Sequence, residues 1–207
     1  MIALFLSAFV TFFVVIDPPG CAPIFAGLTR GTDMAHRTQM AVRSTIVAAL
    51  ILLAFALLGE PLLKTLGISL DAFRIAGGIM LFLIALEMVF EKRQQRRETR
   101  AEDIAAHPEQ YDDISIFPMA MPMIAGPGSI ASAMLMMQRA HGLSAHVIVL
   151  AALAANLAIM MGALLTAGPL MRFLGYKVEA VITRLLGVLL AALAAQFVID
   201  GLRASFA

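Results

Sequence analysis

Residues 1–29 read MIALFLSAFVTFFVVIDPPGCAPIFAGLT, an apolar run in which Asp17 is the only charged side chain. A membrane-spanning helix needs about 20 predominantly apolar residues, so this run is long enough to cross a bilayer. A Pro-Pro pair and a third proline follow Asp17. Proline has no backbone N–H and clashes with the preceding turn of a helix. We therefore predict a membrane helix that breaks near its middle, with residues 16–23 non-helical.

Five further apolar runs approach the same length, and together the six predict an all-α membrane protein with six transmembrane helices. The five runs cover residues 41–59, 69–90, 114–138, 147–171 and 178–200. The third of these five has its own interruption around a Gly-Pro-Gly sequence, so we also expect residues 125–129 to be non-helical. Because the first run has no basic leader, we interpret it as a retained membrane segment instead of a cleaved signal peptide.

Hydrophobic residues make up 61% of the 207-residue chain, against about 45–50% in soluble domains. Lipid is therefore the expected solvent and the first expected partner. The formal net charge is +1, which gives no indication of a nucleic-acid partner. One cysteine, Cys21, and four scattered histidines have no metal-ligand spacing, so we expect neither a metal nor a cofactor.

The polar stretch 91–113 separates two apolar halves, residues 1–90 and 114–207. It carries five basic residues followed by acidic ones, and we expect it to be a solvated cytoplasmic linker. Basic residues accumulate in the cytoplasmic loops of membrane proteins, and eleven of the 15 Lys and Arg fall on the side of this linker. The distribution predicts that both termini are extracytoplasmic, in a membrane of the bacterial inner-membrane type.

The Pro-Gly sequence of the first interruption, residues 19–20, recurs at residues 127–128, an offset of 108. At the same offset, PLLKTLG at 61–67 matches PLMRFLG at 169–175. Each half contains three spans, and an odd number of spans inserts the second half upside down relative to the first. We therefore predict two inverted three-helix repeats with broken first and fourth helices. In such proteins, paired broken helices form the substrate site near the membrane centre.

In this arrangement, the helices that follow the two interruptions both start near the centre of the membrane. Helix starts present unpaired N–H groups and a positive dipole end, which favour a carboxylate. Asp17 and the carbonyl groups freed by the prolines would take an ammonium group, a proton or a small cation, so a zwitterion suits the site. Two of the residues have an alternative role, because Asp17 is also a good helix N-cap and Asn156 is able to pin two helices together. The candidate substrate-binding residues are Asp17, Pro18, Pro19, Gly20, Cys21, Pro23, Gly126, Pro127, Gly128, Ser129 and Asn156.

Four segments resemble the MarC family of small integral membrane proteins, also described as small neutral amino acid transporters. They are DPPGCAPIF at 17–25, GISLDAFRIAGGIMLFLIALEM at 67–88, MPMIAGPG at 121–128 and TRLLGVLLAALAAQFVIDG at 183–201. The resemblance covers almost the whole chain, and it implies a plasma membrane protein of six helices. It also implies transport of small neutral amino acids, which is reported for some members. This chain departs from relatives at Pro19, where they typically have an aliphatic residue, and at Cys21, where they have Asn.

We therefore expect a secondary transporter or exporter of a small-molecule substrate, best matched by small neutral amino acids, that works by alternating access at the paired breaks. The sequence has no phosphate-binding loop that would indicate ATP coupling. A channel or a structural partner of another membrane protein is the alternative. A membrane-embedded enzyme is disfavoured, because neither HExxH nor GxSxG occurs. The sequence leaves a homo-oligomer open.

Overall fold

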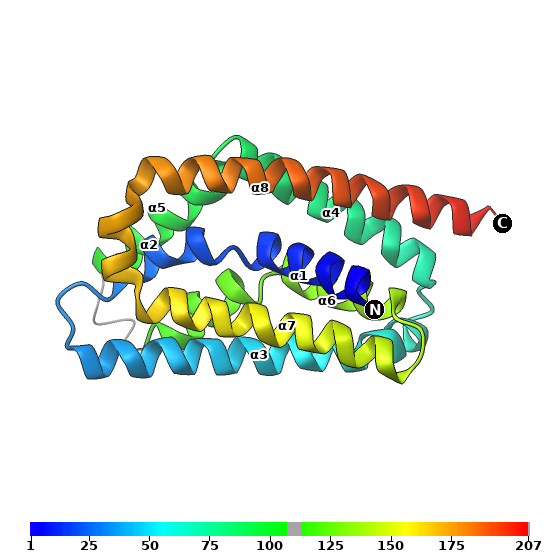
Figure 1. Cartoon of the computed structure of the whole chain (residues 1–207), viewed down its shortest axis with the longest axis horizontal. Coiled ribbons are helices and arrows are strands. Elements are labelled where there is room, and N and C mark those ends of the chain that lie inside the picture. Colours follow the sequence, from blue (N-terminus) through cyan, green and yellow to red (C-terminus); the bar gives the residue numbers. More distant parts are fainter. Residues whose placement is uncertain (107–112, 207) are drawn as a thin grey trace.

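The computed structural model describes residues 1–106 and 113–206, and every element within these ranges is a helix. The elements are α1 (Ile2–Ile16), α2 (Pro18–Leu28), α3 (Met34–Thr65), α4 (Leu70–Val89), α5 (Lys92–Ala106), η2 (Ser115–Ile124), α6 (Pro127–Arg139), α7 (Leu143–Leu165) and α8 (Ala167–Ser205). Both chain termini lie at one end of the bundle, and α2 and α5 lie at the other end (Figure 1).

Six segments of the chain are long and apolar enough to cross a membrane, as predicted. Five of them are continuous or nearly so: Ile2–Leu28, Met34–Thr65, Leu70–Val89, Leu143–Leu165 and Ala180–Ser205. The sixth is the pair formed by η2 and α6, which are bent by 53° relative to each other. The all-α membrane fold is therefore confirmed, and the fourth predicted span is a bent pair of helices with the interruption between them.

The first interruption is shorter than the sequence suggested. Only Asp17 leaves the helical conformation, with a left-handed φ of 59° between the end of α1 and the start of α2. Prolines at the first two positions of α2 are tolerated, because the N–H groups of a first turn have no partner within the helix. Our expectation of a non-helical stretch over residues 16–23 is thus wrong except at Asp17.

The second interruption is longer and more irregular. Phe117 and Met121 each precede a proline and have extended backbone angles inside η2, as residues before proline prefer. Ala125 and Gly126 then separate η2 from α6, which begins at Pro127. The expectation for residues 125–129 therefore holds only for the first two of them.

The longest helix–helix contact joins α4 to α8, and glycines allow the two backbones to approach. A Cβ atom at Gly78 would lie 2.9 Å from the carbonyl oxygen of Ala194, and one at Gly187 would lie 3.1 Å from that of Ala85. Large apolar side chains such as Leu50 and Leu185 remain exposed on the outside of the bundle, where lipid would cover them.

The stretch that we expected to be a solvated linker contains a helix that packs against the bundle. This helix, α5, contacts α2 and α4, and its residues Arg93 and Arg97 turn toward the protein. The sequence did not predict this helix or the inward contacts of these two arginines, whereas other described side chains of α5, such as Lys92 and Glu98, are exposed as a solvated segment requires. Residues 107–112 and the side chains of Arg100, Arg172 and Lys177, which contributed to the predicted orientation, lie outside the described part of the structure.

Candidate functional site

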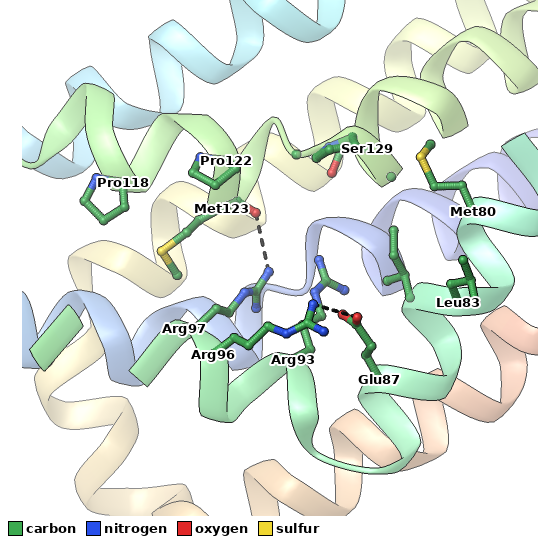
Figure 2. Close-up of a pocket in the computed structure, with 14 residues that line it drawn as sticks. Met80, Leu83, Glu87, Arg93, Arg96, Arg97, Pro118, Pro122, Met123 and Ser129 are labelled. Carbon is green, nitrogen blue, oxygen red and sulfur yellow. Dashed lines mark hydrogen bonds and ion pairs between the residues drawn. The ribbon is translucent and has the colours of Figure 1, made fainter. Parts of the chain in front are cut away.

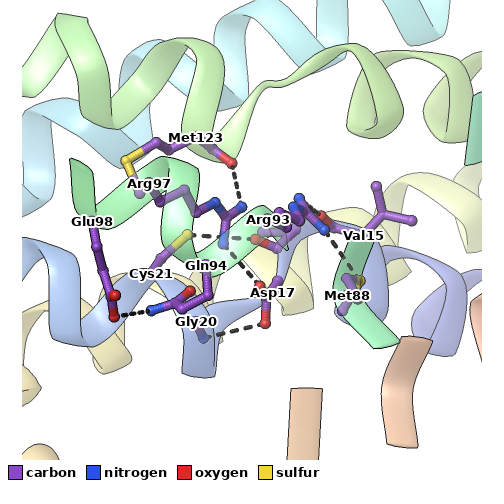
Figure 3. A network of polar contacts seen from close by, with 11 residues as sticks. Val15, Asp17, Gly20, Cys21, Met88, Arg93, Gln94, Arg97, Glu98 and Met123 are labelled. Carbon is purple, nitrogen blue, oxygen red and sulfur yellow. Dashed lines mark hydrogen bonds and ion pairs between the residues drawn. The ribbon is translucent and has the colours of Figure 1, made fainter. Parts of the chain in front are cut away.

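The prolines of the first interruption leave backbone carbonyl groups without a helical partner. In a continuous helix the carbonyl of Val15 would accept from the N–H of residue 19, but Pro19 has none. Arg93 replaces it, because its Nη2 donates to the Val15 oxygen at 2.8 Å (Figure 3). The Cys21 thiol similarly donates to the carbonyl of Ile16 at 3.6 Å.

At the second interruption, too, an arginine of α5 donates to a carbonyl group that proline leaves without a helical partner. The carbonyl of Met123 would accept from residue 127, and Pro127 again lacks the donor. Arg97 Nη2 donates to the Met123 oxygen at 3.4 Å, and its Nη1 donates to Asp17 Oδ2 at 2.8 Å (Figure 3). One side chain of α5 therefore connects the two interruptions.

Asp17 has two partners, one of which confirms the capping role considered from the sequence, and the other is an arginine of the chain itself. Its Oδ1 accepts from the backbone N–H of Gly20 at 3.2 Å, so it caps α2, and its Oδ2 pairs with Arg97. The carboxylate is packed so closely that a Cβ atom at residue 20 would lie 2.3 Å from Oδ2. Gly20 is therefore required by the position of the Asp17 side chain.

Arg93 is held by neutral acceptors, the Val15 carbonyl and the Met88 sulfur, which lies 3.3 Å from Nη1. Burial lowers the pKa of Arg93 to about 10, because a charged guanidinium loses hydration there. The group still carries its positive charge at neutral pH. The site thus contains a half-buried cation whose hydrogen bonds go to uncharged groups.

A cavity of about 440 Å³ opens beside the second interruption, and Arg97 in its wall connects it to the first (Figure 2). Apolar side chains of α4 and the prolines of η2 form much of its wall. Its polar lining comes from Glu87 on α4, from Arg93, Arg96 and Arg97 on α5, and from Ser129 on α6. Arg96 Nη1 lies 2.7 Å from Glu87 Oε1, so groups of both charges face one cavity.

The first turn of α6 lies in this cavity wall. Gly126 is the N-cap and has no side chain, and Pro127 has no N–H. The backbone N–H groups of Gly128 and Ser129 belong to a first turn, where no intrahelical acceptor exists. Ser129 is only 3% exposed, and among the described residues no hydrogen-bond partner reaches its Oγ.

The structure divides the candidate residues of the sequence into three groups. Four of them line the cavity: Gly126, Pro127, Gly128 and Ser129. Six lie outside its lining, at the N-cap and in the first turns of α2: Asp17, Pro18, Pro19, Gly20, Cys21 and Pro23. Among them, Asp17 pairs with Arg97, which lines the cavity. Asn156 lies elsewhere and links α7 to α1, because its Nδ2 donates to the carbonyls of Phe9 at 3.1 Å and Ala152 at 2.9 Å.

Sequence reasoning missed Glu87 and the three arginines of the cavity. The spacing of Arg93 and Arg97 carried a signal, since residues four apart lie on one face of a helix. Asp17 carried a second one, because a buried carboxylate needs a compensating charge. Nothing in the sequence indicated that Arg97 pairs with Asp17, because roughly 80 residues separate them.

A bundle of five apolar spans and a bent apolar helix pair, with a polar cavity beside the bend, defines a multi-pass integral membrane protein. The family model described as MarC family integral membrane protein matches residues 2–206, so this chain belongs to the MarC family. The resemblance found in the sequence motifs is confirmed.

Relatives of similar length occur in bacteria and archaea. UPF0056 membrane protein MJ1677 of Methanocaldococcus jannaschii is 40% identical over 199 residues, which cover 96% of each chain. UPF0056 membrane protein YhcE of Escherichia coli is 32% identical, over 96% of this chain and 91% of the relative. UPF0056 membrane protein YvbG of Bacillus subtilis is 32% identical, over 100% of this chain and 97% of the relative. No solved structure matches the chain.

Proposed function

We propose that the protein is a secondary transporter or exporter of small solutes, and that small neutral amino acids are the best-matched class. One observation carries the proposal: a cavity of about 440 Å³ brings Glu87, three arginines and a helix start without a side-chain cap together beside the second interruption, and one of these arginines pairs with Asp17 at the first. Cavities of roughly 300–1,000 Å³ with a few placed polar groups are typical of small-molecule sites. Groups of both charges suit a zwitterion.

Alternating access would act on the two interruptions. Interrupted helices in inverted repeats commonly form the substrate site of secondary transporters. Here Arg97 bonds to both interruptions, so its contacts are among those that must change if the two halves move apart. We further propose that the protein has no catalytic role and lies in an inner-membrane-type bilayer with both termini extracytoplasmic.

Counterflow in proteoliposomes tests the proposal. Vesicles loaded with unlabelled glycine, alanine or serine should accumulate the labelled amino acid transiently, and the initial rate should saturate with concentration. Flux that rises linearly without saturation would support a channel instead. The absence of flux for every small neutral amino acid would contradict the assigned substrate class.

A matched pair of variants links the flux to the cavity. Glu87→Gln removes a charge from the cavity wall, and Glu91→Gln removes one from a comparable ion pair with Arg184 outside it. Both pairs are partly exposed, so neither change should prevent folding. Transport should fall in Glu87→Gln and persist in Glu91→Gln. Equal rates in the two variants would remove Glu87 and the cavity from the mechanism.

A further inference from the structure

The helices that follow the two interruptions differ in how their first turns are satisfied. At the start of α2, the Asp17 carboxylate occupies the N-cap position and accepts from the N–H of Gly20. At the start of α6, the N-cap is Gly126, which has no side-chain acceptor. One helix start is thus neutralised by a carboxylate of the chain, and the other is not.

The backbone prevents the chain from supplying the second carboxylate in the same way. A Cβ atom at residue 126 would lie 2.4 Å from the carbonyl oxygen of Pro122, closer than real Cβ contacts come. Any side chain at this N-cap would force the two segments apart. Within the described residues, α6 accordingly has no side-chain cap.

A buried hydroxyl group identifies this helix start as a binding site. Ser129 Oγ is withdrawn from solvent, has no hydrogen-bond partner in the described part of the chain and belongs to a residue that lines the cavity (Figure 2). Buried hydroxyl groups are normally paired, since an unpaired one is destabilising. The Oγ of Ser129 and the backbone N–H groups of Gly128 and Ser129 are three donors in one turn.

The charges around the cavity favour an anion at this position. Arg93, Arg96 and Arg97 supply three positive charges, and Glu87 and Asp17 supply two negative ones. A helix start adds the equivalent of roughly half a positive charge. An added carboxylate would therefore bring the group close to neutrality.

We propose that the first turn of α6 binds the carboxylate of a small solute, in the way that the first turn of α2 binds the carboxylate of Asp17. The donors are the N–H groups of Gly128 and Ser129 and the hydroxyl of Ser129, and Arg96 faces the same cavity. This assignment rests on the proposed transport function and adds to it the chemical group by which the solute is held.

Equilibrium binding to the purified full-length protein in detergent tests the assignment, with labelled L-alanine and labelled propionate as the probes. Both should bind and compete with each other, because they share the carboxylate. Alaninamide keeps the amino group of alanine but lacks the carboxylate, so it should not compete. Competition by alaninamide as strong as that of propionate, or no binding of either probe, would overturn the assignment.

Two serine variants test whether the carboxylate binds at the first turn of α6. Ser129→Ala should weaken propionate binding about tenfold, the loss expected for one hydrogen bond to a charged group. Its thermal stability should not fall, because the Ser129 hydroxyl bonds to no described residue. Ser132→Ala is the matched control: Ser132 is also buried and unpaired within the described chain, but it does not line the cavity. Equal loss of binding in both variants, or in neither, would contradict the assignment.

Competition by other anions tests whether the site prefers a carboxylate. Inorganic phosphate or phosphatidylglycerol should displace propionate only weakly, and an oxyanion that binds while carboxylates do not would overturn the carboxylate assignment. The experiment separates this inference from the proposed function. Saturable counterflow of alanine with unchanged kinetics in Ser129→Ala would support the transport function and contradict the carboxylate site on α6. Binding that depends on Ser129, without any flux, would support the site and contradict the transport function.

Discussion

Arg97 Nη1 lies 2.8 Å from Asp17 Oδ2, and the two side chains are 9% and 1% exposed. Breaking such a pair leaves an uncompensated buried charge, so it is far more costly than losing a surface pair. The ion pair therefore fixes α5 to the interruption between α1 and α2. The polar segment between the two halves is part of the folded bundle at this point, not a tether.

A double-mutant cycle should measure this coupling. Asp17→Asn keeps an oxygen for the Gly20 N–H and tolerates the left-handed backbone, but it leaves the Arg97 charge without its carboxylate. We expect each of Asp17→Asn and Arg97→Gln to lower the free energy of unfolding by about 3 kcal/mol. The double variant should lose about 1–3 kcal/mol less than the sum. Denaturation in detergent provides the values, and strict additivity would show that the pair does not stabilise the fold.

The single cysteine reports whether α5 covers the first interruption. Cys21 is fully buried one turn after Asp17. Arg97→Ala should weaken the attachment of α5 and increase the rate at which maleimide modifies Cys21 in intact membranes, by at least several-fold. Lys92→Ala, an exposed change on the same helix, is the control and should leave the rate unchanged. An unchanged rate in both variants would mean that α5 does not limit access.

The positions of the spans and of the two interruptions were predictable from the sequence, because hydropathy and proline act locally. Pro18 illustrates the limit of that reasoning. Proline breaks a helix interior but fits its first turn, and only the structure shows that α2 begins there. Asp17 is therefore the one residue between α1 and α2.

The role of α5 was not predictable, because it depends on contacts between residues far apart in the chain. From the sequence, its arginines were interpreted as solvated charges that indicate the orientation of the chain in the membrane, and composition alone gives no reason to expect that any of them is buried. In the structure, Arg93 and Arg97 replace donors that Pro19 and Pro127 lack. Proline explains why a carbonyl is unpaired, but the residue that pairs it comes from tertiary packing.

Two glycines of α2 should respond in opposite ways to substitution by alanine. In Gly20→Ala the new Cβ would lie 2.3 Å from Asp17 Oδ2, so the carboxylate must move and both of its contacts weaken. We expect a loss of about 2 kcal/mol or more in the free energy of unfolding. In Gly27→Ala the new Cβ meets nothing within 4 Å, and removing a helical glycine should stabilise by up to about 1 kcal/mol. Equal melting temperatures of the two variants would contradict the packing of Asp17 over Gly20.

The orientation of the chain in the membrane has a direct test. The sixth span ends at Ser205, and both termini lie at one end of the bundle (Figure 1). From the distribution of basic residues we expect that end to be extracytoplasmic. Alkaline phosphatase fused after the last residue should therefore be active, and green fluorescent protein fused there should be dark. The opposite pattern would reverse the assigned orientation.

An ion pair at the far end of α6 should also stabilise the protein. Arg139 pairs with Asp200 of α8, and its guanidinium lies 4.2 Å from the centre of the Phe197 ring. Both charged side chains are half-buried, so Asp200→Asn should lower the free energy of unfolding by about 1.5 kcal/mol, the low end of the range for a hydrogen bond to a charged group. The pair between Glu60 and Lys64 is the control, because its side chains are 45% and 67% exposed and Glu60→Gln should change stability by less than about 1 kcal/mol. Denaturation of the two variants side by side gives the comparison. If they lose equal stability, the Arg139 contacts do not hold α6 to α8, and the packing of α6 against α3, α4 and α1 would hold it in place instead.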